Sequence, residues 1–198
     1  RRNNMEKSEL QLKFETIARK AIQREGIEDV LKYLDEKTDF YTAPASTRFH
    51  CDHEGGLVEH SINVFNMLRK SEILDRDKYN IENVAIVSLF HDICKANTYV
   101  TEMRNKKENG QWIQVPFYTV DEEYPYGHGE KSVYILMREG LKLTDEEALA
   151  IRWHMGAYTD SVKGGSFSLN TAFEMSPLAL ELYIADMRAT DYLEKKEK

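Results

Sequence analysis

The sequence has few cysteines and prolines and no long hydrophobic run. Its 198 residues include two cysteines, Cys51 and Cys94, which form no C-x-x-C pair and supply no disulfide framework. No stretch of about 18 apolar residues occurs, so we expect no membrane-spanning segment. The polar start, RRNNMEKSEL, lacks the pattern of a signal peptide. Together these absences predict a protein of the reducing cytoplasm.

An excess of positive charge is also absent. The chain has 27 Lys and Arg residues against 34 Asp and Glu residues, a net charge of −7. Proteins that grip a long nucleic acid by its phosphates usually present a basic face, so a polymer substrate is possible but not favoured. The apolar content of 41% is ordinary for a domain with a hydrophobic core. The length fits one domain, which we assign to residues 1–198.

Apolar periodicity predicts a mostly helical fold. Ser8 is placed to cap a helix that runs to about residue 24. Further helices are expected at residues 27–34, 57–70, 81–96, 129–139 and 145–155, and from Pro177 onward. The residues 38–56 are expected to form a loop. The residues 156–175 are too polar and glycine-rich for regular structure, and the final LEKKEK should be a solvated tail.

One hairpin signal interrupts the helices. The stretches TYVTEM and WIQVPFYTV are rich in β-branched and aromatic residues, and Asn109-Gly110 between them is a typical hairpin turn. We therefore expect a small β-hairpin at about residues 99–119, inserted in an otherwise all-α fold. Three roles stay open for it: packing on the core, covering a site, or forming a dimer contact.

Four polar residues interrupt apolar segments of different expected helices. They are His60 in GGLVEHSINV, His91 in LFHDICK, His154 in IRWHMGAY and Asp186 in YIADMRATD. A buried charge is costly unless it is paired or bound to a metal, so four such residues indicate a shared divalent cation. The neighbour of His91, Asp92, has two oxygens and could bridge two ions. Imidazole and carboxylate ligands suit Fe, Mn, Zn, Co or Ni.

Helical phase separates the thiol of Cys94 from this set. If the helix at residues 81–96 is continuous, Cys94 faces away from His91 and Asp92. We therefore do not expect Cys94 to be a metal ligand.

The order of His60, His91-Asp92 and Asp186 resembles the HD superfamily of metal-dependent phosphohydrolases. The segments PASTRFHCDHEGGLVEHSINV and EMSPLALELYIADMRAT are most similar to the HD domains of bacterial 3′-to-5′ exoribonucleases and their relatives, and the likeness covers residues 44–192. The resemblance implies an HD-type helical bundle in which these four residues hold the primary metal ion. It also implies that His128 and His154 hold a second ion or, alternatively, only line the pocket and bind phosphate.

The sequence departs from the family pattern at several points. HDICK replaces the common HDIGK, and His50 is followed by Cys51 where two adjacent histidines are frequent. A GYP signature of cyclic-dinucleotide hydrolases is absent after the HD pair, and no nucleic-acid-binding module is seen before the domain. The His50-Cys51 departure leaves open which of His50 and His53 takes the substrate-side role, and the missing module argues against a polymer substrate.

The resemblance implies a phosphomonoesterase or phosphodiesterase with one or two divalent ions (Fe, Mn, Zn, Co, Ni or Mg). Water activated by the metal would attack a phosphate ester of a nucleotide or a similar small substrate. Asp92 would orient that water, and Lys95 would contact a phosphate oxygen. His53 and His50 would act as acid, base or phosphate contact, and Arg48 is a weaker candidate for phosphate binding.

Two alternative functions stay open. One is a single-strand 3′-to-5′ exonuclease, against which the acidic balance argues. The other is a non-catalytic sensor that binds a nucleotide or metal without turnover, against which the complete ligand set argues. The pattern leaves the oligomeric state open.

Overall fold

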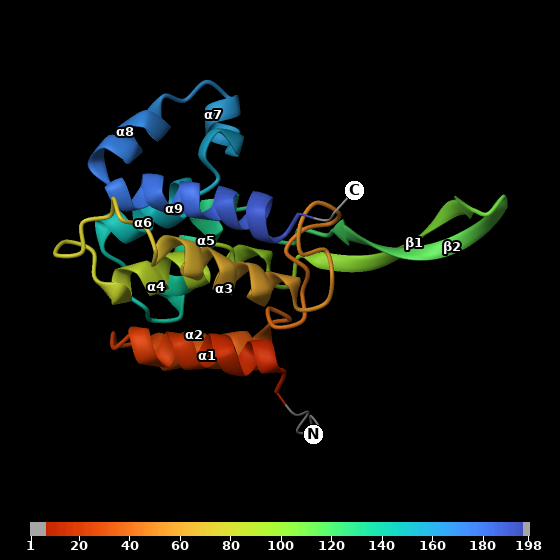
Figure 1. Cartoon of the computed structure of the whole chain (residues 1–198), viewed down its shortest axis with the longest axis horizontal. Helices are drawn as coiled ribbons and strands as arrows, with labels where there is room; N and C mark the ends of the chain where they lie inside the picture. The colour runs from red at the N-terminus through yellow and green to blue at the C-terminus, as the bar shows by residue number, and fades with distance from the viewer. Residues whose placement is uncertain (1–6, 196–198) are drawn as a thin grey trace.

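The computed structural model describes residues 7–195 and shows a helical body from which a two-stranded arm projects (Figure 1). The helices are α1 (Glu9–Ala21), α2 (Ile27–Lys37), α3 (Gly56–Leu68), α4 (Ile81–Phe90), α5 (His128–Arg138), α6 (Asp145–Trp153), α7 (Asp160–Lys163), α8 (Ser168–Met175) and α9 (Pro177–Arg188). Two short 3-10 turns, η1 (Ile93–Lys95) and η2 (Gly156–Tyr158), and a π-helical turn, η3 (Ala189–Leu193), complete the body. None of the described helices is long and apolar enough to cross a membrane.

The body is layered around α3 and α4. In Figure 1, α1 and α2 lie on one side of this pair, and α9 lies on the other. Phe14 of α1 joins the first layer to the centre, because its ring lies 5.2 Å from Phe40 and 5.6 Å from Phe90. These rings are fully buried, and aromatic pairs at such distances add to the stability gained from burial.

Local signals begin several helices where the sequence predicts. The Ser8 hydroxyl accepts a hydrogen bond from the Gln11 amide at the start of α1. Thr144 and Glu147 form the expected capping box of α6. Pro177 is the first residue of α9, as predicted, although the Ser176 side chain does not cap that helix.

The central helix α4 ends earlier than expected. It buries seven of its ten residues but stops at Phe90, so the prediction of a helix to residue 96 is wrong. The chain then tightens into η1, in which the Lys95 amide donates to the Asp92 carbonyl and the Ala96 amide to the Ile93 carbonyl. This change of path places Asp92 and the residues after it differently from a continuous helix.

The residues 156–175 are also more regular than expected. They form η2, α7 and α8, with the pair Gly164 and Gly165 between the last two helices. Ala172 of α8 is buried, and the Phe173 ring stacks on Tyr183 of α9 at 5.9 Å. Packing of a few apolar residues therefore overcomes the polar composition of this segment.

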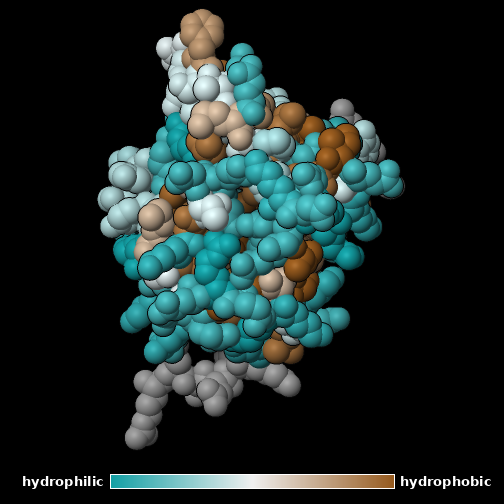
Figure 2. Space-filling model, turned by 90° about the vertical axis from the view of Figure 1, so that its left-hand side faces the viewer, coloured by the Kyte–Doolittle hydropathy of each residue, from teal (hydrophilic) through white to brown (hydrophobic). Residues whose placement is uncertain are grey.

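The arm is the expected hairpin, built from β1 (Tyr99–Glu108) and β2 (Gln111–Val120) in antiparallel register. Asn109 and Gly110 have φ values of 49° and 83°, the left-handed backbone that a tight hairpin turn requires. Most of its side chains are exposed, including Met103 and Trp112, so the arm does not pack on the core of the described chain. The end of the body opposite the arm is mostly hydrophilic (Figure 2).

Candidate metal centre

Three elements bring their polar residues to one buried point. His60 lies on α3, His91 follows α4, and Asp186 lies on α9. The Nε2 atom of His60 lies 3.2 Å from His91 Nε2 and 3.3 Å from Asp186 Oδ1. These three residues can hold one metal ion, because each offers one ligand atom and the three ligand atoms lie within 4.8 Å of one another.

Asp92 links this set to a second set of histidines. Its Oδ2 atom lies 3.6 Å from His60 Nε2 and 3.5 Å from His91 Nε2. Its Oδ1 atom lies 2.8 Å from His128 Nε2 and 3.3 Å from His154 Nε2. The two oxygens of one carboxylate thus face two different groups of nitrogens. A carboxylate placed in this way can bridge two ions.

Backbone and side-chain acceptors fix the orientation of the imidazoles. His91 Nδ1 lies 2.8 Å from the Ser88 carbonyl, and His154 Nδ1 lies 2.6 Å from the Ile151 carbonyl. A carbonyl only accepts, so each Nδ1 carries the proton and each Nε2 presents its lone pair to the centre. Metal-binding histidines in proteins are held by partners of this kind.

The His154 ring supplies an observation that fits a cation. The residue is fully buried, and its Nε2 atom has no hydrogen-bond partner although Asp92 Oδ1 is 3.3 Å away. An unpaired buried polar atom costs free energy, and coordination of a metal would satisfy it. The donor set therefore fits a divalent metal ion.

The second set depends on close packing of α5 against α6. A Cβ atom on Gly129 would lie 2.3 Å from the carbonyl oxygen of Arg152, so this position has no room for a side chain. The close approach brings the rings of His128 and His154 to 5.1 Å between centroids.

Burial and neighbouring charges set the ionisation of these groups. Burial lowers the pKa of His91 to about 4, which keeps the ring neutral near pH 7. Burial alone would raise the pKa of Asp92, but Lys95 and His91 outweigh it and hold that pKa well below its usual value. Burial also lowers the pKa of His60, but hydrogen bonds with Asp186 and Glu194 prevail and raise it to about 10. The carboxylates of Asp92, Asp186 and Glu194 therefore stabilise a positive charge that lies between them.

Lys95 lies against the same carboxylate. Its Nζ atom is 2.6 Å from Asp92 Oδ2, and its side chain retains 15% exposure. It is thus close enough to the centre to contact a bound anion and is still reachable from solvent.

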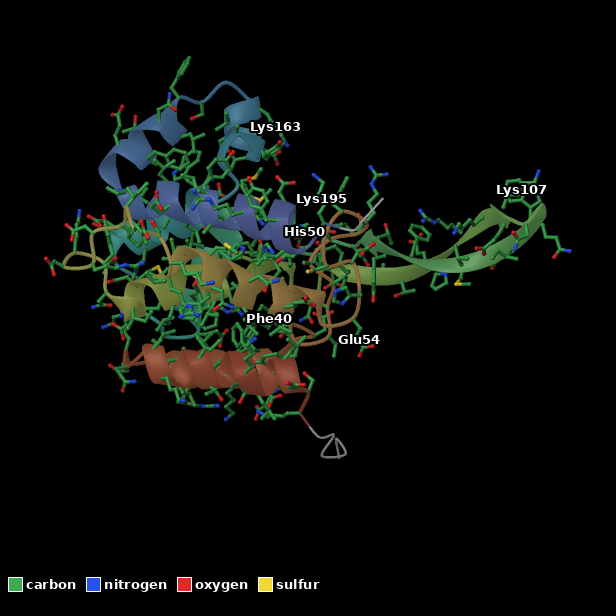
Figure 3. The ribbon with its side chains drawn as sticks, viewed as in Figure 1. Phe40, His50, Glu54, Lys107, Lys163 and Lys195 are labelled. Carbon is green, nitrogen blue, oxygen red and sulfur yellow. The ribbon has the colours of Figure 1, made fainter. Side chains whose placement is uncertain are left out.

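The other residues considered for the substrate are placed unequally. His50 lies beside the centre, with its ring 4.8 Å from that of His60 and its Nδ1 3.0 Å from Glu194 Oε2. His53 is exposed and lies near Glu54 and Glu59, with no described contact to Asp92. Arg48 is exposed and stacks on the Phe49 ring at 4.8 Å, also without a described contact to the centre. Figure 3 shows His50 close to Lys195, where the arm meets the body.

Two residues at the centre were misjudged from the sequence. Cys94 does not face away, because the helix has already ended, and its Sγ atom lies 3.4 Å from His128 Nδ1. Glu194 does not belong to a solvated tail, because η3 turns it inward to His60. No periodic pattern in the sequence indicates that Glu194 turns inward. The position of Cys94 follows once the end of the preceding helix is known.

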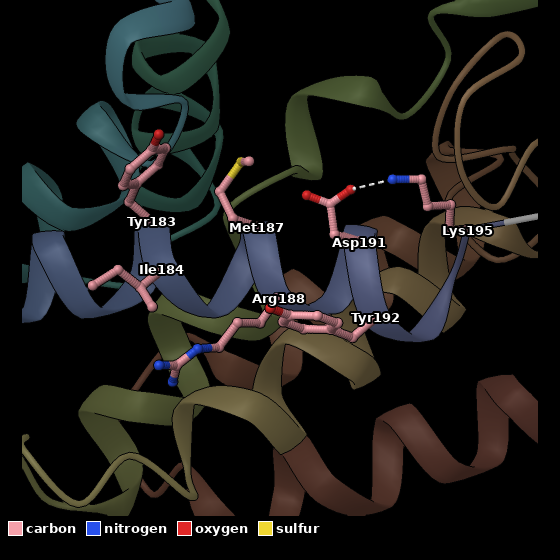
Figure 4. A pocket seen from close by; sticks show the side chains of 7 residues that line it. All are labelled: Tyr183, Ile184, Met187, Arg188, Asp191, Tyr192 and Lys195. Carbon is pink, nitrogen blue, oxygen red and sulfur yellow. Dashed lines mark hydrogen bonds and ion pairs between the residues drawn. The ribbon is translucent and has the colours of Figure 1, made fainter.

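The outer side of α9 carries a separate shallow cavity of about 450 Å³ (Figure 4). It is lined by Tyr183, Ile184, Met187, Arg188, Asp191, Tyr192 and Lys195. Asp191 and Lys195 form an ion pair of 3.2 Å across it. None of the metal-facing residues lines this cavity.

Comparison with known proteins gives a partial likeness. No family model and no solved structure match the chain. A curated protein that does match is the dihydroneopterin 2′,3′-cyclic phosphate phosphodiesterase of Methanocaldococcus jannaschii, with 31% identity over 83 residues. The matched segment is 40% of this chain and 31% of that protein.

Proposed function

We propose that the chain is a metal-dependent phosphohydrolase of the HD superfamily that acts on a small phosphate ester. The observation that carries the proposal is Asp92, whose two oxygens face separate groups of histidines at 2.8 to 3.6 Å. Assignment of residues 1–198 to one domain of this type is part of the proposal.

The residues divide into two ligand groups. His60, His91, Asp92 and Asp186 would hold the first ion, and Asp92, His128 and His154 would hold a second. Bound divalent cations supply Lewis acidity to phosphate oxygens and make water available as a nucleophile near neutral pH.

The residues of the chain supply positioning and charge. Asp92 accepts a hydrogen bond from the attacking water. This bond directs the lone pair of the water oxygen toward phosphorus. Lys95, 2.6 Å from that carboxylate, donates to a phosphate oxygen on which negative charge builds up. His50, at the rim beside His60, is placed to contact the substrate, whereas His53 and Arg48 would need to move to do so.

A phosphodiester of a small nucleotide-like molecule is the substrate class that the comparison favours. The relative from M. jannaschii acts, by its name, on a 2′,3′-cyclic phosphate. The net charge of −7 opposes a long polyanion, so we place a cyclic or small linear phosphodiester ahead of single-stranded RNA.

Assay of the metal-loaded protein tests the proposal. We would measure turnover of 2′,3′-cyclic nucleotides, nucleoside monophosphates, nucleoside triphosphates and short RNA with Mn²⁺, Fe²⁺, Co²⁺, Ni²⁺, Zn²⁺ and Mg²⁺ in turn. Hydrolysis of a small ester that is lost in Asp92→Ala supports the proposal. The Asp160→Ala variant is the control, since this carboxylate on α7 is fully exposed. Turnover of RNA alone would indicate an exonuclease, and nucleotide binding without turnover under any metal would indicate a sensor.

A further inference from the structure

The second group of ligands includes a sulfur atom that the proposed function leaves unused. Cys94 Sγ lies 3.4 Å from His128 Nδ1 and 3.7 Å from His128 Nε2. The residue is 3% exposed. Cys94, His128 and Asp92 each offer one ligand atom within 4.8 Å of the others.

We propose that Cys94 coordinates the ion at the second position together with Asp92 and His128. A thiolate ligand would make this position prefer Zn²⁺, Co²⁺ or Fe²⁺ to Mg²⁺ or Mn²⁺, because soft sulfur binds the harder ions weakly. This inference rests on the proposed metal centre and adds a ligand and a metal preference to it.

The distance from sulfur to nitrogen agrees with direct coordination, and the distance from His128 to Asp92 would lengthen when the ion binds. Tetrahedral zinc has bonds of about 2.3 Å to sulfur and about 2.0–2.1 Å to nitrogen, which separates the two ligand atoms by about 3.5 Å. The observed separation of Sγ and Nε2 is 3.7 Å. The corresponding separation of nitrogen and carboxylate oxygen is about 3.4 Å. His154 Nε2 and Asp92 Oδ1, at 3.3 Å, already match it, whereas His128 Nε2 and Asp92 Oδ1, at 2.8 Å, would separate by about 0.6 Å on binding the ion.

The backbone holds the thiol in this place. The amide of Cys94 donates to Ser132 Oγ of α5 at 3.3 Å, which joins η1 to the helix that carries His128. Separately, the buried and unpartnered His154 Nε2 points to a missing ligand on the same side of Asp92. When the S–metal bond forms, the thiol proton passes to solvent, and neither partner is oxidised or reduced.

A second arrangement of the same atoms has a different consequence. The Cys94 sulfur could accept a hydrogen bond from His128 Nδ1 and only orient that ring. In that arrangement no bond joins sulfur to the metal. A spectroscopic signal of the bond itself therefore separates the two roles.

Cobalt substitution is the test. The full-length, metal-free protein would be titrated with Co²⁺ while visible d–d absorption and the near-ultraviolet thiolate-to-cobalt charge-transfer band are recorded. We expect both signals in the wild type and loss of the charge-transfer band in Cys94→Ser. The matched control is Cys51→Ser, which removes the other thiol of the chain and should keep the band. Zn²⁺ affinity at the second position should fall about tenfold or more in Cys94→Ser, with a smaller change for Mn²⁺.

The outcomes separate this inference from the proposed function. Visible cobalt absorption without the charge-transfer band, or a band that survives in Cys94→Ser, would overturn coordination by Cys94 and leave the metal centre intact. A band lost in Cys51→Ser instead would assign the thiolate to the group of Cys51, His53 and Glu59. Failure of the wild type to bind Co²⁺ would overturn both. The melting temperature of Cys94→Ser shows whether loss of the band reflects unfolding.

The arm carries an independent inference. It exposes large apolar side chains on both faces of the ribbon, with Met103, Trp112 and Val120 on one face and Val100 and Ile113 on the other. A two-stranded hairpin alone is only marginally stable in water, and its edges are unpaired. We infer that the arm of a second copy covers the face of Met103, Trp112 and Val120, with the two arms antiparallel about a twofold axis.

Charge along the arm favours this antiparallel arrangement. Arg104, Lys106 and Lys107 outnumber Glu108 toward its far end, where Figure 3 labels Lys107, while Asp121 and Glu123 follow β2 at its base. In antiparallel arms the basic end of each copy meets the acidic base of the other, whereas parallel arms would place like charges together.

Sedimentation velocity over a range of concentrations tests this arrangement. We expect a dimer in the wild type, at least tenfold weaker association in Lys106→Glu/Lys107→Glu, and recovery when Asp121→Lys/Glu123→Lys is added. Lys163→Glu, on α7 away from the arm, is the control (Figure 3). A wild type that stays monomeric at about 100 μM, or a dimer indifferent to the charge exchange, would overturn the inference.

Discussion

Glu194 Oε2 lies 2.9 Å from His60 Nδ1, although 134 residues separate the two along the chain. The π-helical turn η3 widens the end of α9 and directs this carboxylate inward. Asn63 donates to the other oxygen, Oε1, at 3.0 Å. The acceptor that orients the first histidine of the centre is therefore supplied by the end of the described chain.

Loss of this carboxylate should weaken metal binding. We expect about tenfold lower affinity of the first position for Co²⁺ in Glu194→Gln and up to about 100-fold in Glu194→Ala, because His60 loses the partner that fixes its ring. Equilibrium dialysis measures the affinity. Asp191→Asn is the control, since that exposed carboxylate pairs with Lys195. Unchanged affinity in both Glu194 variants would show that the contact does not support the metal centre.

Removal of the lysine charge should reduce turnover without removing metal. In Lys95→Met we expect kcat/KM to fall about 10²- to 10³-fold, since a donor to the developing phosphate charge is lost. Metal content per chain should be unchanged, because Lys95 is not a ligand. Steady-state kinetics and elemental analysis measure the two effects, with Lys163→Met as an exposed control. Loss of metal together with activity would contradict the assigned role.

Removal of the metal should destabilise the fold. A ligand present at about 1,000 times its Kd adds about 4 kcal/mol to the free energy of unfolding, which for a chain of this length corresponds to a melting temperature higher by about 8 to 16 °C. Calorimetry with and without a chelator measures the difference. The difference should shrink strongly in Asp92→Ala, which lacks the shared ligand. Equal melting temperatures in the wild type would argue against a structural contribution of the metal.

A buried glutamate on α1 should make stability depend on acid. Burial raises the pKa of Glu15, but its bonds with Lys7, Arg19 and Gln11 prevail and lower the pKa below 4.5. Its contribution is therefore complete above the unfolded pKa of about 4.5 and is lost as pH falls through the folded value. Glu15→Gln should cost about 1–2 kcal/mol at pH 7 and progressively less below pH 4.5.

Urea unfolding at pH 7 and at pH 3.5 measures this difference. Glu28→Gln is the matched control, because Glu28 also contacts Arg19 but is largely exposed. A destabilisation of Glu15→Gln that is the same at both pH values would contradict the assigned cause.

Much of the helical layout could be predicted because burial leaves a periodic trace. Phe14 on α1 and the apolar residues of α4 repeat at helical spacing, and the turn at Asn109-Gly110 needs residues that tolerate positive φ. Isolated polar residues in apolar helices, such as His60 and Asp186, were visible by contrast with their neighbours. The structure brings both to the same point.

The remaining features depend on where regular structure stops. The position of Cys94 follows from the end of α4 at Phe90, which no glycine or proline marks in the sequence. The position of Glu194 follows from a π-turn, which has no compositional signal. The order in α8 depends on contacts with α6, which lies well before it in the chain, and with α9, which follows it. Tertiary packing decides each of these, so local sequence could not.

The tight contact at Gly129 has a consequence for how this protein can vary. Even one methyl group there would meet a main-chain oxygen and push α5 away from α6, carrying His128 from His154. A single substitution could thus separate the ligands proposed for the second ion while every one of those side chains stays in the sequence. A count of histidines alone would not reveal that loss.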